Sequence, residues 1–179
     1  METVAAVKEV VRTGIDAVPQ LRLYLFPNIG EAFLKHLNLA EQSIVGTAFC
    51  IDHEEGCEIL RRKAREGLQI RIMLDHGQWV KTGSARMPDQ VQSLINYGVV
   101  IKTRRLEERG MFASHHAKTW AIDGQVYLGG SANLTNNACK SEEHLIVIRD
   151  QEFLQEHLNW FENLWSNPQA FVLTRGRGS

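Results

Sequence analysis

One stretch constrains this chain more than any other: two β-rich runs joined by an Asp-Gly pair. The first run, His115 to Asp123, reads His-His-Ala-Lys-Thr-Trp-Ala-Ile-Asp, and the second leads into Gly129 to Asn133, Gly-Gly-Ser-Ala-Asn. Asp-Gly between such runs is a strong signal for a β-hairpin. Residues two apart in a strand share a face, so His116 and Lys118 are expected to point the same way. An imidazole beside an ammonium group predicts a binding site for an anion.

The length of the loop decides which side chains meet. A two-residue loop at Asp123-Gly124 places His116 opposite Ser131, with Lys118 and Asn133 on the same face. A three-residue loop with a bulge would shift the pairing by one residue and put Ser131 on the other face. The anion site therefore predicts the two-residue register, or a local irregularity that restores it.

The totals fit an ordinary soluble globular protein. The chain has 179 residues, of which 44% are hydrophobic and 23% charged, which favours one domain. The net charge of −1 gives no bulk attraction to nucleic acid or acidic membranes, so an anion site must be local. Three cysteines, an odd number, argue against a disulfide framework and favour a reducing, cytoplasmic location.

No targeting, membrane or metal-binding segment is expected. A secretory signal needs a long apolar region, and a membrane span needs about 18 apolar residues; neither pattern occurs. His53 and Cys57 have the i,i+4 spacing of metal ligands, but two ligands do not make a zinc site.

Alternating helix and strand patterns predict a single α/β domain with a mixed β-sheet sandwiched between helices. Residues 1–20 are expected to be an N-terminal helical segment, 21–166 the main domain and 167–179 a C-terminal tail. Within these, strands are predicted over 21–26, 43–51, 69–74, 99–103, the two arms of the hairpin and 143–149; helices over 4–15, 31–40, 54–67, 88–97 and 151–165; and loops over 81–87 and 104–114.

The hairpin carries the pattern H-x-K-x4-D, followed by Gly-Ser-x-Asn. Its members are His116, Lys118, Asp123, Gly130, Ser131 and Asn133. This pattern resembles the signature of the phospholipase D superfamily, and the likeness extends over roughly residues 21–165. The resemblance implies an α/β/α sandwich that acts as a phosphodiesterase without metal or other cofactor.

The family resemblance also implies a mechanism. His116 would attack phosphorus to form a phosphohistidine, while a second histidine protonates the leaving oxygen and later activates water; imidazole suits both roles near pH 7. Lys118, Ser131 and Asn133 are expected to bind the phosphoryl oxygens. This chain has one signature where the chemistry needs two. Family members with one signature pair as two-fold dimers, so the resemblance implies a homodimer in which the two copies of His116 share one site.

Carboxylates are expected to support the histidine. Glu143 is the predicted acceptor for its second ring nitrogen because Glu143 matches the family position, and the adjacent Glu142 is the alternative. Asp123 belongs to the signature, but its place in the turn also gives it a structural role. His115 is expected to face the other side of the strand.

Two groups of residues are candidates for a substrate groove. His76 and Trp79 follow a strand, where loops often carry function. Arg104 and Arg105, with Lys102 and Arg109 nearby, are suited to a nucleic acid backbone. The plainer interpretation is a solvated loop, since acidic residues interrupt the basic run.

The favoured function is that of a small nuclease. The first alternative is a phospholipase or phosphatidyl hydrolase of the same superfamily, which would need an exposed apolar lip that the sequence does not clearly show. The second is a non-catalytic module that binds a nucleic acid backbone, against which the intact His116, Lys118 and Asn133 argue. The preference for DNA or RNA, for strandedness and for sequence is left open.

Overall fold

The computed structural model describes residues 20–80, 87–106, 110 and 113–174. Their strands form one eight-stranded sheet in the order β1-β7-β6-β5-β2-β3-β4-β8. β2, β3 and β4 run parallel, and the other neighbours pair antiparallel. The strands are β1 (Gln20–Leu25), β2 (Ser43–Ala48), β3 (Gln69–Asp75), β4 (Val100–Arg104), β5 (Thr119–Ile122), β6 (Val126–Gly130), β7 (His144–Arg149) and β8 (Phe171–Val172).

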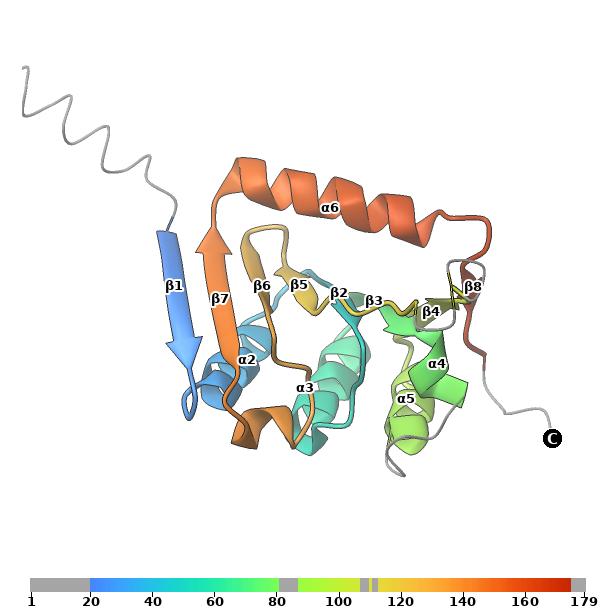
Figure 1. Cartoon of the computed structure of the whole chain (residues 1–179), viewed down its shortest axis with the longest axis horizontal. Coiled ribbons are helices and arrows are strands. Elements are labelled where there is room, and N and C mark those ends of the chain that lie inside the picture. Colours follow the sequence, from blue (N-terminus) through green and yellow to red (C-terminus); the bar gives the residue numbers. More distant parts are fainter. Residues whose placement is uncertain (1–19, 81–86, 107–109, 111–112, 175–179) are drawn as a thin grey trace, which may run out of the picture.

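Helices cover both faces of this sheet, as Figure 1 shows. The long helix α6 crosses one face, and α2, α3 and α5 lie on the other. The predicted mixed α/β sandwich is therefore confirmed. The helices are α2 (Ile29–Asn38), α3 (Glu54–Arg65), α4 (His76–Val80), α5 (Met87–Asn96) and α6 (Gln151–Trp165), with a short 3-10 helix, η2 (Ala138–Lys140).

Each face of the sheet has its own apolar core. The core on the α6 side is small. The helix α6 itself is capped at its start by the Asp150 carboxylate, which accepts the backbone N–H of Phe153 at 2.8 Å. The larger core lies under α2, α3 and α5, and Trp120 is buried there, edge-on to Phe33. The α6-side core consists of Val45, Met73, Ala121, Leu154 and Phe161.

The end of the domain differs from the prediction. Phe171 and Val172 form β8 against β4, and Leu173 is buried, its N–H bonding to the carbonyl of Ile101 at 2.8 Å. Residues 171–173 therefore belong to the domain and not to a tail. A two-residue strand has no periodicity that a sequence pattern could reveal. The predicted helix over 4–15, most of the loop over 81–87, Arg109 and residues 175–179 lie outside the described residues.

The hairpin adopts the three-residue loop, so the predicted two-residue register is wrong. Ile122 pairs with Val126, and Thr119 pairs with Gly129. Asp123 and Gly124 both have positive φ, 54° and 63°. The hydrogen bonds that Asp123 makes to residues just before and at the start of β2, described below, shape this turn more than the Asp-Gly pair does by itself.

A buried histidine on α6 makes the fold sensitive to acid. His157 packs against the rings of Tyr127 and Trp160, with centroids 5.0 and 5.6 Å away, and burial lowers its pKa to about 4. Its Nε2 is buried and has no hydrogen-bond partner among the residues that the structure describes. An unfolded histidine titrates near 6.5, so protonation below that pH favours the unfolded chain.

We therefore expect stability to fall as the pH drops from about 6.5 toward 4. The variant His157→Phe keeps an aromatic ring and removes the titrating group, so it should lose less stability over the same range. Thermal unfolding midpoints at pH 7 and at acid pH, measured for both proteins, check this. Equal acid losses in the two proteins would show that His157 is not responsible.

Candidate active site

The site is built around an exposed histidine backed by a buried lysine. His116 and Lys118 lie in the extended segment just before β5, where the side chain of His116 is exposed and Lys118 is 6% exposed. The Lys118 Nζ lies 3.1 Å from His116 Nδ1 and donates to the His116 carbonyl at 2.7 Å. The prediction that both side chains point the same way is confirmed.

Phe49 forms one wall of the site. It follows β2, and its ring meets the His116 ring edge-on with centroids 4.7 Å apart. The Lys118 ammonium lies 5.3 Å from the centre of the same ring, a cation–π contact. Sequence reasoning missed Phe49, because inside an apolar run it is indistinguishable from a core residue.

Electrostatics link Glu143 to the lysine. Burial lowers the pKa of Lys118, and the nearby Glu143 carboxylate opposes that shift. In the part of the chain that the structure describes, the His116 ring bonds to Lys118 and not to Glu143. With Lys118 charged, Nζ donates and Nδ1 accepts, so the proton of the neutral ring sits on Nε2.

Ser131 and Asn133 both make structural hydrogen bonds near the site. The Ser131 hydroxyl accepts the backbone N–H of His144 at 3.1 Å, which ties it to β7. The Asn133 amide oxygen accepts the N–H of Cys50 at 3.3 Å, next to Phe49. The regular pairing of β5 with β6 starts only at Thr119, opposite Gly129. Ser131 and Asn133 follow β6 and lie outside this pairing, so the predicted register does not set their positions.

Asp123 lies at the opposite end of β5 from His116. Its carboxylate accepts three backbone N–H groups, those of Glu41 at 2.9 Å, Gln42 at 2.8 Å and Ser43 at 2.9 Å. It therefore clamps the hairpin onto the start of β2. Of the two roles open to it from the sequence, the structure supports the structural one.

We expect Asp123→Asn to lower the free energy of unfolding by about 1 to 3 kcal/mol, since hydrogen bonds to a charged acceptor are lost. Asn tolerates the positive φ of this position, so the backbone strain is small. Urea unfolding measures the loss. The shift of the His116 ring signals on adding inorganic phosphate should stay as in the parent protein. If the folded variant no longer responds to phosphate, Asp123 contributes to the phosphate site and its role is not only structural.

The predicted groove residues are not gathered in one place. His76 is buried at the start of α4 and packs against Phe171, 5.5 Å between ring centroids. Trp79 packs against the larger core. Arg104 ends β4 opposite Asp75, close enough to lower the pKa of His115, and Arg105 is exposed. Of the predicted groove residues, the two arginines remain candidates, because they lie near residues 113–118, the catalytic segment that carries His116.

His115 lies on the α6 side, as the strand alternation predicted. Its ring stacks on Trp160 at 6.4 Å, and burial lowers its pKa to about 4. Its backbone N–H donates to the Asp75 carboxylate at 2.7 Å. Asp75 was not among the residues predicted from the sequence, because a carboxylate that ends an apolar strand reveals its partner only once the strands are assembled.

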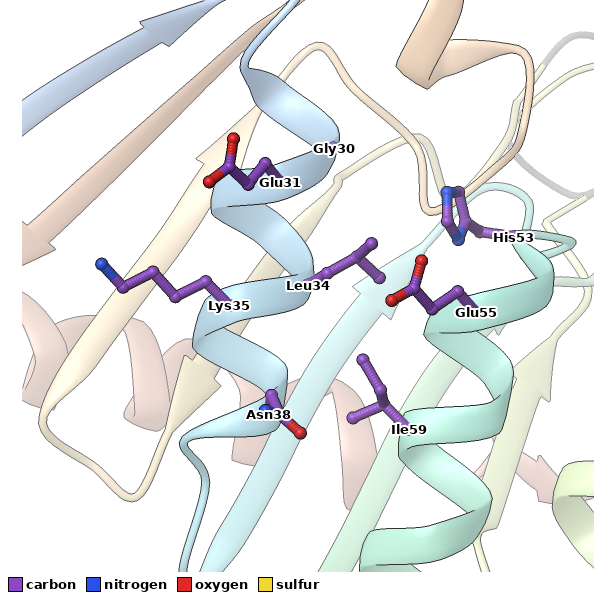
Figure 2. Close-up of a pocket in the computed structure, with 8 residues that line it drawn as sticks. All are labelled: Gly30, Glu31, Leu34, Lys35, Asn38, His53, Glu55 and Ile59. Carbon is purple, nitrogen blue, oxygen red and sulfur yellow. The ribbon is translucent and has the colours of Figure 1, made fainter.

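A separate cavity of about 670 Å³ lies between α2 and α3. Figure 2 shows Leu34 and Ile59 pointing into the space between the helices, Lys35 pointing away, and His53 and Glu55 along its rim. The signature residues do not line it, and its apolar floor lacks convergent groups for a phosphate. The active-site candidate is therefore the surface around His116.

The family described as "Cardiolipin synthase, PLD-like domain" matches residues 33–165. The chain belongs to this phospholipase D-like family. It is 24% identical over 135 residues to the mitochondrial cardiolipin hydrolase of Chlamydomonas reinhardtii, covering 74% of this chain. The chain spans 56% of that relative's length.

Solved structures show the same fold. Nuc from Salmonella typhimurium, a phospholipase D family member, superposes with a TM-score of 0.75 at 19% identity, covering 88% of this chain and 99% of Nuc. NucT from Helicobacter pylori superposes with a TM-score of 0.70 at 15% identity, covering 87% of this chain and 100% of NucT. These two likenesses extend over most of the chain and show that it has the phospholipase D-like fold.

Two features are missing from the ranges that the structure describes. Within residues 20–80, 87–106, 110 and 113–174, no group of three or more His, Cys, Asp or Glu side chains is arranged to hold a metal ion. None of the helices in those ranges has the length and apolar character that crossing a membrane requires.

Proposed function

We propose that the protein is a phosphodiesterase, specifically a metal-independent nuclease, with His116 as its nucleophile. The observation that carries this proposal is the pair formed by an exposed imidazole and a buried ammonium, 3.1 Å apart. The pair offers a phosphodiester a nucleophile and a positive charge in one place. Together with family membership, this arrangement favours phosphoryl chemistry over a structural role for His116.

In the first step, His116 Nε2 attacks phosphorus, a P–N bond forms, and the bond to the leaving oxygen breaks. A second histidine gives that oxygen a proton. Water then attacks phosphorus, the P–N bond breaks, and the second histidine takes the water's proton. Lys118 stabilises the negative charge on the phosphoryl oxygens, and it does so strongly because it is buried.

The reaction needs two histidines in different protonation states, a neutral nucleophile and a protonated acid, and this chain carries one signature histidine. The general acid is an imidazolium with protons on both ring nitrogens, and it gives up the proton on Nε2. The nucleophile needs a free lone pair on Nε2, so its ring proton must move to Nδ1. We propose that two protomers meet about a two-fold axis and each supplies one His116. Light scattering at working concentration should give the mass of two chains, and a monomer alone would contradict the shared site.

Nucleic acid is the favoured substrate. Arg104 and Arg105 lie at the end of β4, beside Asp75 and close to His115, where they suit a phosphate backbone. Lys102 is occupied elsewhere, since its Nζ donates to the Trp165 carbonyl at 2.8 Å. A module that only binds the backbone would not need a nucleophile backed by a buried cation.

The test is cleavage of single- and double-stranded DNA and RNA in excess chelator. Chelator-resistant cleavage should fall by about 1,000-fold or more in His116→Ala, because the nucleophile is lost. The matched control is His53→Asn, which removes a histidine away from the site and keeps a good cap for α3; it should cleave normally. Cleavage that survives His116→Ala rules out this mechanism, and binding without cleavage favours the non-catalytic module.

One observation favours phospholipid as a second candidate substrate. Leu21, Leu23 and Leu25 share one face of the edge strand β1 and are 60%, 55% and 57% exposed, and Phe26 follows at 48%. Leu25 pairs with His144, which bonds to Ser131, so this apolar row reaches the site. The sequence did not show this apolar lip clearly, because alternation in β1 predicts an inward face for the leucines.

If lipid is the substrate, Leu23→Asp should abolish hydrolysis of cardiolipin in vesicles and leave a short soluble phosphodiester unaffected. Val100→Asp is the matched control, since Val100 is an exposed apolar residue, 41% exposed, at the opposite end of the sheet. Equal vesicle hydrolysis by all three proteins, or none by the parent, would exclude this candidate.

A further inference from the structure

The segment that carries His116 is not part of the sheet ladder. β5 starts at Thr119, and residues 113–118 precede it outside the strands, although the Lys118 carbonyl still accepts the backbone N–H of Gly130 at 3.3 Å. A catalytic group must be held within a fraction of an ångström of its productive position, and backbone with a single bond to a neighbouring strand does not do this alone. Side chains from other elements must therefore fix this segment.

Asp75 is one such side chain. It ends β3, is 4% exposed, and uses both carboxylate oxygens. Its Oδ2 accepts the backbone N–H of His115 at 2.7 Å, and its Oδ1 accepts that of Gln78 at 2.9 Å. Because β2 lies between β3 and β5 in the sheet, Asp75 reaches past the end of β2 to make the first bond.

This bond acts directly on the backbone next to His116. It fixes the peptide N–H of His115, while Lys118 fixes the carbonyl of His116 at 2.7 Å. The two bonds hold the backbone on either side of the His116 Cα. A short bond to a buried, charged acceptor is stronger than a bond between neutral groups.

We infer that Asp75 is a positioning residue, which sets the backbone of the catalytic segment so that the His116 ring faces the phosphodiester. This inference rests on the proposed function. Asp75 touches neither the His116 ring nor the open face of the site, and it would act through the His115 peptide alone. The signature does not contain Asp75.

A purely structural role is the rival explanation, because Asp75 also caps α4 through Gln78. Two variants separate the roles. Gln78→Pro removes the capped N–H, in the first turn of a helix where proline is tolerated, and leaves the bond to His115. Thr103→Val removes a different buried hydrogen bond in the same region, from Thr103 Oγ1 to the Leu74 carbonyl at 2.9 Å.

The experiment compares Asp75→Asn with these two controls in the full chain. Asp75→Asn should lower kcat by about 100-fold with KM within about twofold, since misplacing a catalytic group by about 1 Å costs that much. Hydrogen exchange at the His115 amide should quicken. Gln78→Pro and Thr103→Val should keep kcat within about threefold at a comparable loss of thermal stability. A kcat for Asp75→Asn within threefold of the parent would overturn the inference, as would equal losses in the controls.

A second readout keeps this test apart from the proposed function. Inorganic phosphate should shift the His116 ring signals in the parent protein, and the size or direction of that shift should change in folded Asp75→Asn but stay as in the parent in both controls. If the parent cleaves no phosphodiester, the proposed function fails while this readout still decides whether Asp75 positions His116. An unchanged phosphate response in Asp75→Asn would refute positioning.

Discussion

The buried ammonium group of Lys118 is the interaction on which the site depends. A buried cation is costly unless it is paired and hydrogen-bonded. Lys118 finds its partners in the ring and carbonyl of His116, the face of Phe49 and the field of Glu143. The exposed histidine is therefore the outer end of a buried polar cluster. Lys118 contacts its ring at Nδ1, and the side chain as a whole is exposed.

Polar side chains bonded to distant backbone hold this arrangement in place. Asp123 clamps one end of the hairpin to the start of β2, and Asp75 fixes the catalytic segment at the other end. Asn133 bonds to Cys50 and so holds the signature's second half against the loop that carries Phe49. Each contact joins residues at least 40 positions apart. These long-range bonds explain how a site can sit on loops and still be rigid.

Periodicity made much of the fold predictable. The helices over 54–65 and 151–165 have long amphipathic patterns, and His116 and Lys118 share a face because they stand two apart. The hairpin register was not predictable, because the conformation of the turn depends on hydrogen bonds from the backbone of Glu41 to Ser43 to the Asp123 carboxylate. Phe49 and Asp75 were missed for the same reason: their roles arise only when β2 and β3 finish beside the catalytic segment. A local sequence pattern does not encode contacts between segments that are far apart in the chain.

The central claim is that one His116 of a pair becomes covalently linked to phosphorus. Rapid quenching during turnover, at a pH that preserves phosphohistidine, followed by intact mass and peptide mapping tests it most directly. We expect a phosphorus-linked substrate fragment on His116, at one adduct for every two chains, and none in His116→Ala. An adduct on another residue would contradict the phosphohistidine intermediate. So would turnover without any adduct, with product that accumulates linearly from the first cycle.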